Sequence, residues 1–263
     1  MQSHDEAQLM ETWARQAGAY ALEIFQDYAA AAPRRKADNS WVTEVDENIE
    51  QMLRQQIAQA FPDDLIMGEE GGGQASSSGR IWVLDPIDGT GSFVKRLPVW
   101  CVSIGLLVDG YPAAGCVYLP VLDECYLAGL TGPATLNGQA IHAENPDFLD
   151  SQSWMAVPSN AHWRYKISYP GKTRSLGSTA ANVCYVASSR ACAAILGNAS
   201  LWDIAGAWPI LERAGGKLST FSGGPFDWQR FYEGSSANEP LFAASNDNYA
   251  TMRGMIDLAK GAI

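Results

Sequence analysis

A short apolar run that ends in two carboxylates constrains this chain more than any other stretch of it. Residues 81–84 are apolar and predict a short buried strand, which leads directly into Asp85-Pro86-Ile87-Asp88-Gly89-Thr90. Because Pro86 has a fixed φ and no N–H, we expect it to end the strand and hold a tight turn. Such a turn can aim Asp85 and Asp88 at one point, where they would repel each other unless a cation or a proton lay between them. The alternative is an ordinary strand followed by an acidic turn.

Length and charge limit the kinds of protein that the chain can be. With 263 residues, of which 47% are hydrophobic, it is long enough for a large core in one unit or in two lobes. The formal net charge of -11 disfavours a nucleic-acid-binding surface, which needs a basic patch. Residues 1–11 are polar and acidic, and no run of about 18 apolar residues occurs, so we expect neither a signal peptide nor a membrane span.

The use of cysteine and histidine narrows the chemistry. The five cysteines form no C-x-x-C pair and lie mostly in apolar stretches, which indicates reduced, buried thiols in a cytoplasmic protein. The three histidines are scattered along the chain, so neither a zinc site nor a Ser-His-Asp site is expected.

Hydrophobic spacing and turn residues predict a mixture of helices and strands. Asp109-Gly110 lies between two β-rich runs and indicates a hairpin, so antiparallel strands enter the sheet. Residues 71–79 are rich in Gly and Ser and predict a surface loop. We expect helices over residues 5–31, 44–60, 179–190, 204–214 and 248–260, a short strand or turn at 41–43, and strands over 65–67, 81–84, 99–108, 111–119, 124–128, 154–157, 193–196, 218–221 and 241–244.

Three further segments bear on organisation and ligand contacts. Residues 159–172 interleave aromatic and basic side chains, a pattern that occurs in nucleotide stacking but is more typical of one face of a surface helix or loop. Arg34-Arg35-Lys36 follows the first predicted helix, where the helix dipole favours cations and where an anion contact is the alternative. Residues 144–150 resemble a connection, and we place a boundary there between lobes 1–145 and 146–263.

Five acidic residues precede predicted turns or helix starts. Three of them follow short apolar runs, and ligand sites in α/β proteins gather at sheet edges. A cluster of carboxylates without cysteine or histidine selects hard cations, and Mg²⁺ or Mn²⁺ fits best. Two such ions can clamp both ends of an in-line phosphoryl displacement, while the Gly89 and Thr90 amides hold the phosphate. The five acids are Asp46, Glu69, Asp85, Asp88 and Asp203.

Two residues before predicted helices also have an ordinary structural explanation. Asp203 alone is typical of an N-cap, and Ser178 predicts the N-cap of the helix that follows it. The helix start at Gly177-Ser178-Thr179 is equally a geometry that binds phosphate. Spacing alone leaves both interpretations open.

Five short motifs follow one another in a recognisable order. They are Gly68-Glu69-Glu70, Asp85-Pro86-Ile87-Asp88-Gly89-Thr90, Leu201-Trp202-Asp203-Ile204-Ala205-Gly206, Ala214-Gly215-Gly216 and Gly223-Gly224-Pro225-Phe226. In this order the chain resembles the inositol monophosphatase family, which belongs to the Mg²⁺-dependent, lithium-sensitive phosphatases. The resemblance extends from Lys36 to Asn246 and implies a mixed α/β (α+β) fold, a layered αβαβα sandwich.

The resemblance implies a role for each acidic position. Thr90, paired with Asp46, would orient and activate the attacking water, and Glu69 would belong to the same catalytic group. For the metals, it implies that Glu69, Asp85 and the Ile87 carbonyl bind a first ion, that Asp85, Asp88 and Asp203 bind a second, and that Glu69 with waters binds a third, weaker one.

The resemblance also implies contacts to the substrate. The Gly89 and Thr90 amides would hold phosphate, and Lys36 stands where the family has a basic residue near the site. Gly177-Ser178-Thr179 matches a stretch that contacts substrate in the family. Members that favour inositol phosphate carry a glutamate where this chain has Leu196, which cannot accept a hydrogen bond, so Asn198 is left as the substitute.

These features predict a Mg²⁺-dependent phosphomonoesterase that binds two to three ions, with Mn²⁺ as a substitute. Inositol 1-phosphate is the first candidate substrate, and histidinol phosphate, fructose 1,6-bisphosphate and a 3′-phosphonucleotide are the alternatives. A non-catalytic binding or regulatory protein on the same fold is the alternative of another class, although no ligand position is lost. The partner is a small phosphorylated metabolite, and the resemblance further implies lithium sensitivity and a cytoplasmic homodimer.

Overall fold

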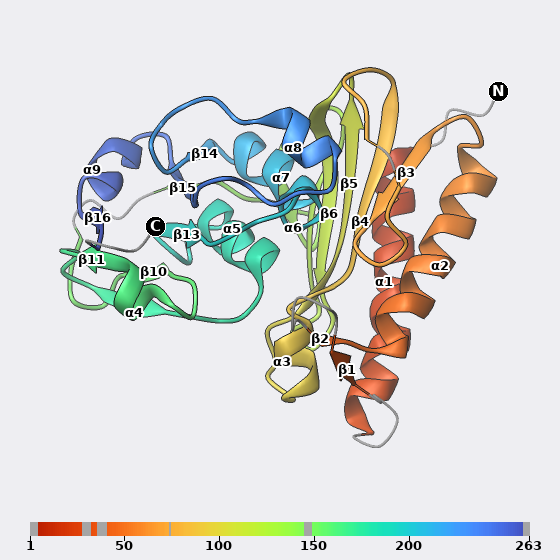
Figure 1. Cartoon of the computed structure of the whole chain (residues 1–263), viewed down its shortest axis with the longest axis horizontal. Helices are drawn as coiled ribbons and strands as arrows, with labels where there is room; N and C mark the ends of the chain where they lie inside the picture. The colour runs from red at the N-terminus through yellow and green to blue at the C-terminus, as the bar shows by residue number, and fades with distance from the viewer. Residues whose placement is uncertain (1–4, 28–32, 36–40, 74, 145–148, 260–263) are drawn as a thin grey trace.

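The elements of the chain stack in five layers in the order αβαβα (Figure 1). The computed structural model describes residues 5–27, 33–35, 41–73, 75–144 and 149–259. Within this part, a pair of long helices covers a large sheet, a group of shorter helices separates that sheet from a smaller one, and two short helices cover the far side. The fold class that the sequence predicts is confirmed.

The first layer consists of α1 (Glu6–Gln26) and α2 (Glu44–Ala60), which pack on the large sheet through apolar stripes. A capping box starts α2, because the side chain of Thr43 accepts a backbone bond while Asp46 bonds back to Thr43. Asp46 is thereby fixed in the first buried turn of the helix. The helix predicted over residues 5–31 ends at Gln26, and residues 28–32 lie outside the described part.

The large sheet forms the second layer and carries the hairpin predicted at Asp109-Gly110. Its first two strands are parallel and all other neighbours are antiparallel, in the order β3-β4-β5-β6-β7-β8-β9. The strands are β3 (Leu65–Gly68), β4 (Arg80–Asp88), β5 (Cys101–Val108), β6 (Tyr111–Leu119), β7 (Glu124–Ala128), β8 (Thr135–Leu136) and β9 (Gln139–Ala140).

The prediction that Pro86 ends its strand is wrong, because β4 continues through it to Asp88. Asp85 lies opposite Ser103, whereas Asp88 lies opposite Cys101, so the register shifts by one residue between the two acids. This is a β-bulge, a feature that accommodates a proline and re-aims side chains. The sheet therefore bends at Pro86 instead of ending there.

The smaller sheet has the order β12-β10-β13-β15-β14, in which the first three strands are parallel. Helices α5, α6 and α7 lie between it and the large sheet (Figure 1). The strands are β10 (Trp154–Ala156), β12 (Lys172–Arg174), β13 (Ala193–Leu196), β14 (Gly216–Thr220) and β15 (Leu241–Ser245), and the helices are α5 (Thr179–Ala187), α6 (Leu201–Ala205) and α7 (Ala207–Arg213).

Two predicted C-terminal helices differ from the structure. The helix expected over residues 204–214 is divided into α6 and α7, and α6 starts earlier, at Leu201. The helix expected over residues 248–260 is only α9 (Tyr249–Arg253), followed by β16 (Ile256–Leu258), which pairs antiparallel with β11 (Tyr165–Ile167). A glycine after α9 allows the chain to leave the helix, and pairing with β11 supplies the backbone bonds that a longer helix would have made.

Short elements complete the described chain. The segment of residues 159–172 forms a single helical turn and part of the β11–β16 pair, as expected for a surface element. The remaining elements are β1 (Arg34–Arg35), β2 (Trp41–Val42), α3 (Thr90–Val94), α4 (Ala161–Arg164) and α8 (Trp228–Tyr232). The lobe boundary expected near residue 145 falls at residues 145–148, which lie outside the described part, so it stays a prediction.

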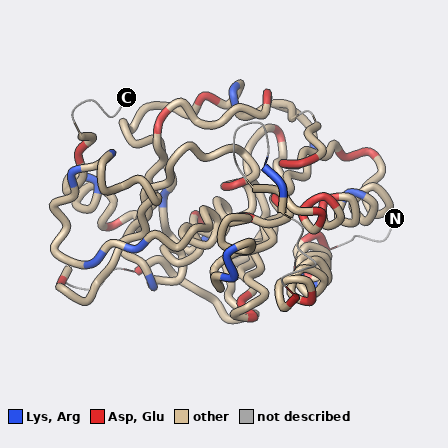
Figure 2. Tube along the Cα trace, turned by 60° about the horizontal axis from the view of Figure 1, so that its bottom comes forward, with Lys and Arg blue, Asp and Glu red and all other residues tan. Residues whose placement is uncertain are grey.

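Charged residues are distributed over the described trace, with Lys and Arg positions scattered among acidic ones (Figure 2). Within residues 5–259 as described, no helix has both the length and the apolarity to cross a bilayer. All five cysteines are free and buried, as the sequence indicates.

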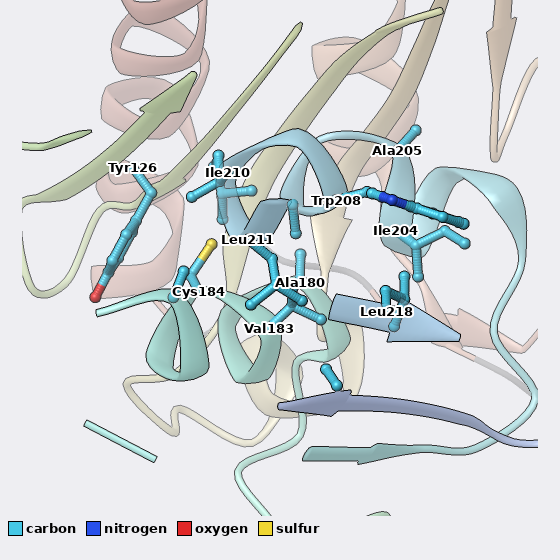
Figure 3. Close-up of a cluster of buried hydrophobic side chains, with 14 of the residues drawn as sticks. Tyr126, Ala180, Val183, Cys184, Ile204, Ala205, Trp208, Ile210, Leu211 and Leu218 are labelled. Carbon is cyan, nitrogen blue, oxygen red and sulfur yellow. The ribbon is translucent and has the colours of Figure 1, made fainter. Parts of the chain in front are cut away.

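A large apolar cluster holds α5, α6 and α7 between the two sheets (Figure 3). Val183 of α5, Leu211 of α7 and Leu218 of β14 belong to this cluster. On the side of the large sheet, the fit depends on glycine, because a Cβ on Gly115 would overlap the carbonyl group of Gly206. This close approach fixes the α6–α7 junction against the sheet that carries β4.

Candidate active site

Three carboxylates from two elements, the strand β4 and the helix α6, converge between the layers. Asp85, Asp88 and Asp203 can each offer an oxygen within 4.8 Å of the others. Asp85 and Asp88 stand on either side of the bulge in β4, and Asp203 lies in α6. The bulge and the glycine contact at the α6–α7 junction therefore bring together three of the five acids that the sequence selected.

Asp85 is the most unusual of the three. Its side chain is 1% exposed, and neither carboxylate oxygen has a hydrogen-bond partner among the described residues. Burial, and next the charge of Glu69, raise the pKa of Asp85 well above its usual range. A buried carboxyl group with two unsatisfied oxygens is costly in a protein interior. A divalent cation would satisfy both oxygens, so the donor set fits a metal of the Mg²⁺ type.

Asp88 is held at the start of α5. It accepts hydrogen bonds from the Ser178 hydroxyl at 2.6 Å, from the Ala180 N–H at 2.6 Å and from the Thr179 N–H at 3.1 Å. Burial raises the pKa of Asp88, and these hydrogen bonds act in the opposite direction. Ser178 is also the N-cap of α5, as predicted, because its hydroxyl accepts the Ala181 N–H. These bonds hold the Asp88 carboxylate beside Asp85 and Asp203.

Asp203 is not the N-cap that its position alone suggested. Ser200 caps α6, and Asp203 is the third residue of the helix, where its Oδ2 accepts the Ser200 N–H at 2.6 Å. This capping box sets the direction of the Asp203 side chain. The acid thus serves the helix start and the carboxylate cluster together.

A second pair, Thr90 and Asp46, lies beside the cluster. The Thr90 hydroxyl is 3.2 Å from Oδ1 of Asp46 and 3.1 Å from the Ile87 carbonyl oxygen, and it can donate to either. The other carboxylate oxygen of Asp46 accepts from the N–H and hydroxyl of Thr43. Burial raises the pKa of Asp46 to about 6, although the Thr43 bonds favour the charged form. A hydroxyl between a carboxylate and a carbonyl can orient a water molecule and pass on its proton.

Glu69 follows β3 in the turn that the sequence predicted as a metal-binding motif. Its N–H donates to the Leu84 carbonyl at 3.1 Å. Because Leu84 directly precedes Asp85 in β4, this bond holds the turn next to Asp85. The charge of Glu69 acts on both Asp85 and Asp46, so the three carboxyl groups share one electrostatic environment.

Glu50 is a functional candidate that the sequence reasoning missed. It is 2% exposed and accepts the backbone N–H groups of Glu70 and Gly71, each at 2.8 Å. Arg54 pairs with it at 2.8 Å, and a Cβ on Gly68 would overlap its carboxylate. The signal was present in the spacing, because a carboxylate four residues after Asp46 lies on the same, buried face of the helix.

Four of the seven predicted substrate contacts line one cavity beside Asp88. Gly177, Ser178, Thr179 and Asn198 all line a cavity of about 190 Å³, and Leu196 lines it as well. Gly89 precedes α3 with a φ of +95°, a left-handed conformation that favours glycine. Lys36 lies outside the described residues, so its predicted contact stays a prediction. Cys101, which was not selected from the sequence, completes this side with its thiol 3.6 Å from Asp88.

Comparisons with known proteins identify the family of the chain. A model of the inositol monophosphatase family matches residues 5–250. A histidinol-phosphatase of Chlorobaculum parvum is 35% identical over 83% of this chain and 86% of its own length. Human inositol monophosphatase 1 is 34% identical over 82% of this chain and 83% of its own. The solved structure of an IMPase from Thermotoga maritima has a TM-score of 0.83 at 24% identity and covers 96% of both chains.

The layered fold and the buried carboxylate cluster, taken with these matches, define a hydrolase that acts on phosphate monoesters. The chain belongs to the inositol monophosphatase family, a metal-dependent family whose substrates are small phosphorylated molecules.

Proposed function

We propose that this chain hydrolyses a small phosphate monoester by means of water activated at bound Mg²⁺. The observation that carries the proposal is Asp85, whose two buried oxygens lack a partner among the described residues. Hard cations prefer oxygen ligands, and Mg²⁺ uses carboxylates together with waters and substrate phosphate. Mn²⁺ is the expected substitute.

The proposed ligands come from the turn after β3, from β4 and from α6. Glu69, Asp85 and the Ile87 carbonyl would hold one ion, Asp85, Asp88 and Asp203 would hold a second, and Glu69 would help to hold a third. When bound, such ions lower the pKa of water and stabilise the charge on the leaving oxygen. The chain's own contribution is to fix these oxygens beforehand, through the capping boxes at Asp46 and Asp203 and the bonds to Asp88.

Thr90 and Asp46 have the geometry for the proton. The Thr90 hydroxyl would hold the attacking water and donate toward Asp46, which accepts at 3.2 Å. Glu69 would belong to the same catalytic group as Thr90 and Asp46, and it would also lie beside Asp85. The N–H groups of Gly89 and Thr90 at the start of α3 would hold phosphate oxygens, and Lys36 would add a positive charge nearby.

Inositol 1-phosphate is the first candidate substrate, in keeping with the name of the human relative. Histidinol phosphate is the second, because one similar protein is named a histidinol-phosphatase. Fructose 1,6-bisphosphate and a 3′-phosphonucleotide remain further candidates. Leu196 argues against inositol, because it is 2% exposed and offers no acceptor, which leaves Asn198 as the polar group in the same cavity.

We further expect a homodimer in the cytoplasm, inhibition by lithium, and no binding of nucleic acid. The scattered positions of Lys and Arg over the described trace (Figure 2) and the net charge of -11 support the last point. Light scattering tests the homodimer. A mobility-shift assay with duplex DNA and with RNA, at several salt concentrations, tests the absence of nucleic-acid binding.

The decisive experiment is phosphate release from a panel of monoesters during a titration with Mg²⁺. We expect release that depends on metal, is abolished by EDTA and is inhibited by lithium. If no ester in a broad panel releases phosphate at any Mg²⁺ concentration, the alternative of a binding or regulatory protein on this fold replaces the phosphatase.

A further inference from the structure

The turn that leads into α5 lies directly against the start of α3. This turn, residues 176–178, connects β12 with α5. A Cβ on Gly89, which precedes α3, would lie 2.9 Å from the Gly177 carbonyl oxygen and 3.3 Å from the Cβ of Ser178. Both glycines have a left-handed backbone, with a φ of +95° for Gly89 and +90° for Gly177. The two turns are therefore so close that a side chain on Gly89 would not fit without displacing the 176–178 turn.

Ser92 of α3 connects the two turns by a hydrogen bond. Its side chain is 5% exposed, and its hydroxyl donates to the Leu176 carbonyl at 3.3 Å. Its own backbone is fixed at the start of α3, because its N–H donates to the Gly89 carbonyl at 2.8 Å. Among the described residues, no other side-chain hydrogen bond reaches Leu176 or Gly177. The position of the 176–178 turn relative to α3 therefore depends on the Ser92 hydroxyl.

The same hydroxyl packs on Gly177. A Cβ on Gly177 would overlap the Ser92 hydroxyl, and the next atom, the Ser92 Cβ, would lie at 3.6 Å, which is an ordinary contact distance. Apart from the chain neighbours of Gly177, no other described residue comes within 4 Å of that position. Ser92 thus holds the turn through a contact as well as a hydrogen bond, and a glycine at position 177 leaves the room for it.

The 176–178 turn leads into the groups that hold Asp88. The Ser178 hydroxyl and the N–H groups of Thr179 and Ala180 donate to the Asp88 carboxylate. Gly177, Ser178 and Thr179 also line the cavity beside Asp88. A displacement of the turn would therefore move one wall of this cavity together with three donors to a clustered carboxylate.

The proton-handling pair does not depend on this turn. The Thr90 hydroxyl has its bonds with Asp46 and with the Ile87 carbonyl, and Asp46 is held by the capping box of α2. Loosening of the 176–178 turn therefore acts on the binding of the ester more than on the activation of water.

We propose that Ser92 is a positioning residue, which fixes the cavity wall at the start of α5 against the phosphate-holding turn at Gly89 and Thr90. The proposal rests on the phosphatase function proposed above and deepens it. Ser92 acts through Leu176 and Gly177 and needs no contact with the ester. By fixing the turn before the ester binds, it lowers the entropy that binding would otherwise lose.

The test is the steady-state kinetics of Ser92→Ala at saturating Mg²⁺, with the ester that the wild type hydrolyses best. KM should rise about threefold or more, because binding must now also order the turn. The value of kcat should change less than KM, because Thr90 and Asp46 keep their own bonds. Inorganic phosphate has no group that could extend to the turn, so its Ki as a competitive inhibitor should stay within about twofold of the wild type.

Ser188→Ala is the matched control. The Ser188 hydroxyl donates to the Cys184 carbonyl at 2.9 Å at the other end of α5, so this variant loses the same kind of bond without touching the turn. Its KM should equal that of the wild type. An unchanged KM in Ser92→Ala, an equal rise of KM and Ki, or the same rise of KM in Ser188→Ala would each overturn the proposal.

Gly177→Ala examines the contact from the other side. Its methyl group would overlap the Ser92 hydroxyl and push the turn away from α3, so KM should rise. In the Ser92→Ala background this overlap is gone, while the strain of an alanine at a φ of +90° is the same in both backgrounds. The rise in KM caused by Gly177→Ala should therefore be about threefold or more smaller in Ser92→Ala than in the wild type. Equal rises in the two backgrounds would contradict a shared contact.

The two proposals fail in different ways. If the wild type releases no phosphate from any ester of a broad panel, the phosphatase function fails and the role of Ser92 with it. If the wild type is active and Ser92→Ala has the same KM, the role of Ser92 fails and the phosphatase function remains.

Discussion

The carboxylate of Glu50 accepts the backbone N–H of Glu70 at 2.8 Å, and so joins the second long helix to the turn that carries Glu69. The same carboxylate accepts the Gly71 N–H, and its partner Arg54 also donates to the carbonyl of Gly72. Glu50 thus fixes the backbone of the two residues that directly follow Glu69. It is therefore a positioning residue for the metal site.

Glu50→Gln should weaken metal binding without unfolding the chain. The amide keeps the shape of the side chain but presents N–H groups where two backbone donors point, so the turn loses one acceptor. Loss of a group that orients a metal ligand typically costs about 10–100-fold in metal affinity or activity. We expect the Mg²⁺ concentration for half-maximal velocity to rise about tenfold, with kcat at saturating Mg²⁺ reduced less.

Glu47→Gln on the same helix is the control for that variant. Glu47 pairs with Arg34 at 2.7 Å on the surface, where both side chains are about half exposed, and such pairs contribute little to stability. Its Mg²⁺ requirement should stay within twofold of the wild type. Equal Mg²⁺ curves for the wild type and Glu50→Gln would show that the turn does not depend on Glu50.

Asp88→Asn should abolish most of the activity while the fold persists. The side-chain amide can still accept one of the bonds from Ser178 and the start of α5, but it removes a charge from the carboxylate cluster. We expect kcat/KM to fall at least about 100-fold, with an unchanged far-ultraviolet circular dichroism spectrum. Hydrolysis of the best substrate at the wild-type rate would contradict the metal site proposed here.

Thr90→Ala and Thr90→Ser separate the hydroxyl from the space that it occupies. Only the hydroxyl can hold a water and donate toward Asp46, so removing it should lower kcat by about 10²–10⁴-fold while KM changes little. Serine should restore most of kcat, because it supplies the same group on a freer side chain. A large loss in the serine variant, or a loss confined to KM, would assign Thr90 a binding role instead.

The metal-free protein should become less stable as the pH rises from 5 to 7.5. Burial raises the pKa of Asp46 to about 6 and raises the pKa values of Asp85 and Asp88 as well. The folded state therefore holds protons that the unfolded chain has already released, so this stability is present at low pH and is lost as the pH passes the folded values. For Asp46 alone the loss between pH 5 and 7.5 is on the order of 1 kcal/mol, because the rest of the effect lies below pH 5.

Thermal unfolding in EDTA measures this dependence. The Tm should be higher at pH 5 than at pH 7.5. The variant Asp46→Asn should make this difference in Tm smaller. Added Mg²⁺ should raise the Tm most at the higher pH, where the carboxyl groups are ionised and able to bind it. A metal-free Tm that rises with pH over this range would be inconsistent with the buried, proton-holding carboxyl groups.

Local sequence patterns predicted much of this architecture, and the failures have physical causes. The strand before Asp85 was expected to end at Pro86, because a proline removes a backbone donor. The strand β4 tolerates that loss because one extra residue bulges between Asp85 and Asp88 against the opposite strand, which no local pattern reveals. The residues after α9 were expected to continue a helix. Instead they form β16, because β11, a strand from a distant part of the chain, pairs with them.

The site shows the same division between local and distant information. Asp85 and Asp88 can be selected from their spacing, and Glu69 and Asp203 from their positions after short apolar runs, whereas the family resemblance supplies their roles as ligands. Glu50 was missed because its importance lies in which backbone groups it meets, and these are twenty residues away.

The division of the carboxylates between two parts of the fold links metal loading to the way the molecule comes apart. Asp203 belongs to a helix packed between the sheets, whereas Asp85 and Asp88 belong to the large sheet. Any partial opening that detaches α6 dismantles the cation cage before the large sheet itself unfolds. A bound ion therefore raises the free energy of such openings. In the metal-bound protein, we expect amide hydrogen exchange and proteolysis to report a single cooperative unfolding unit.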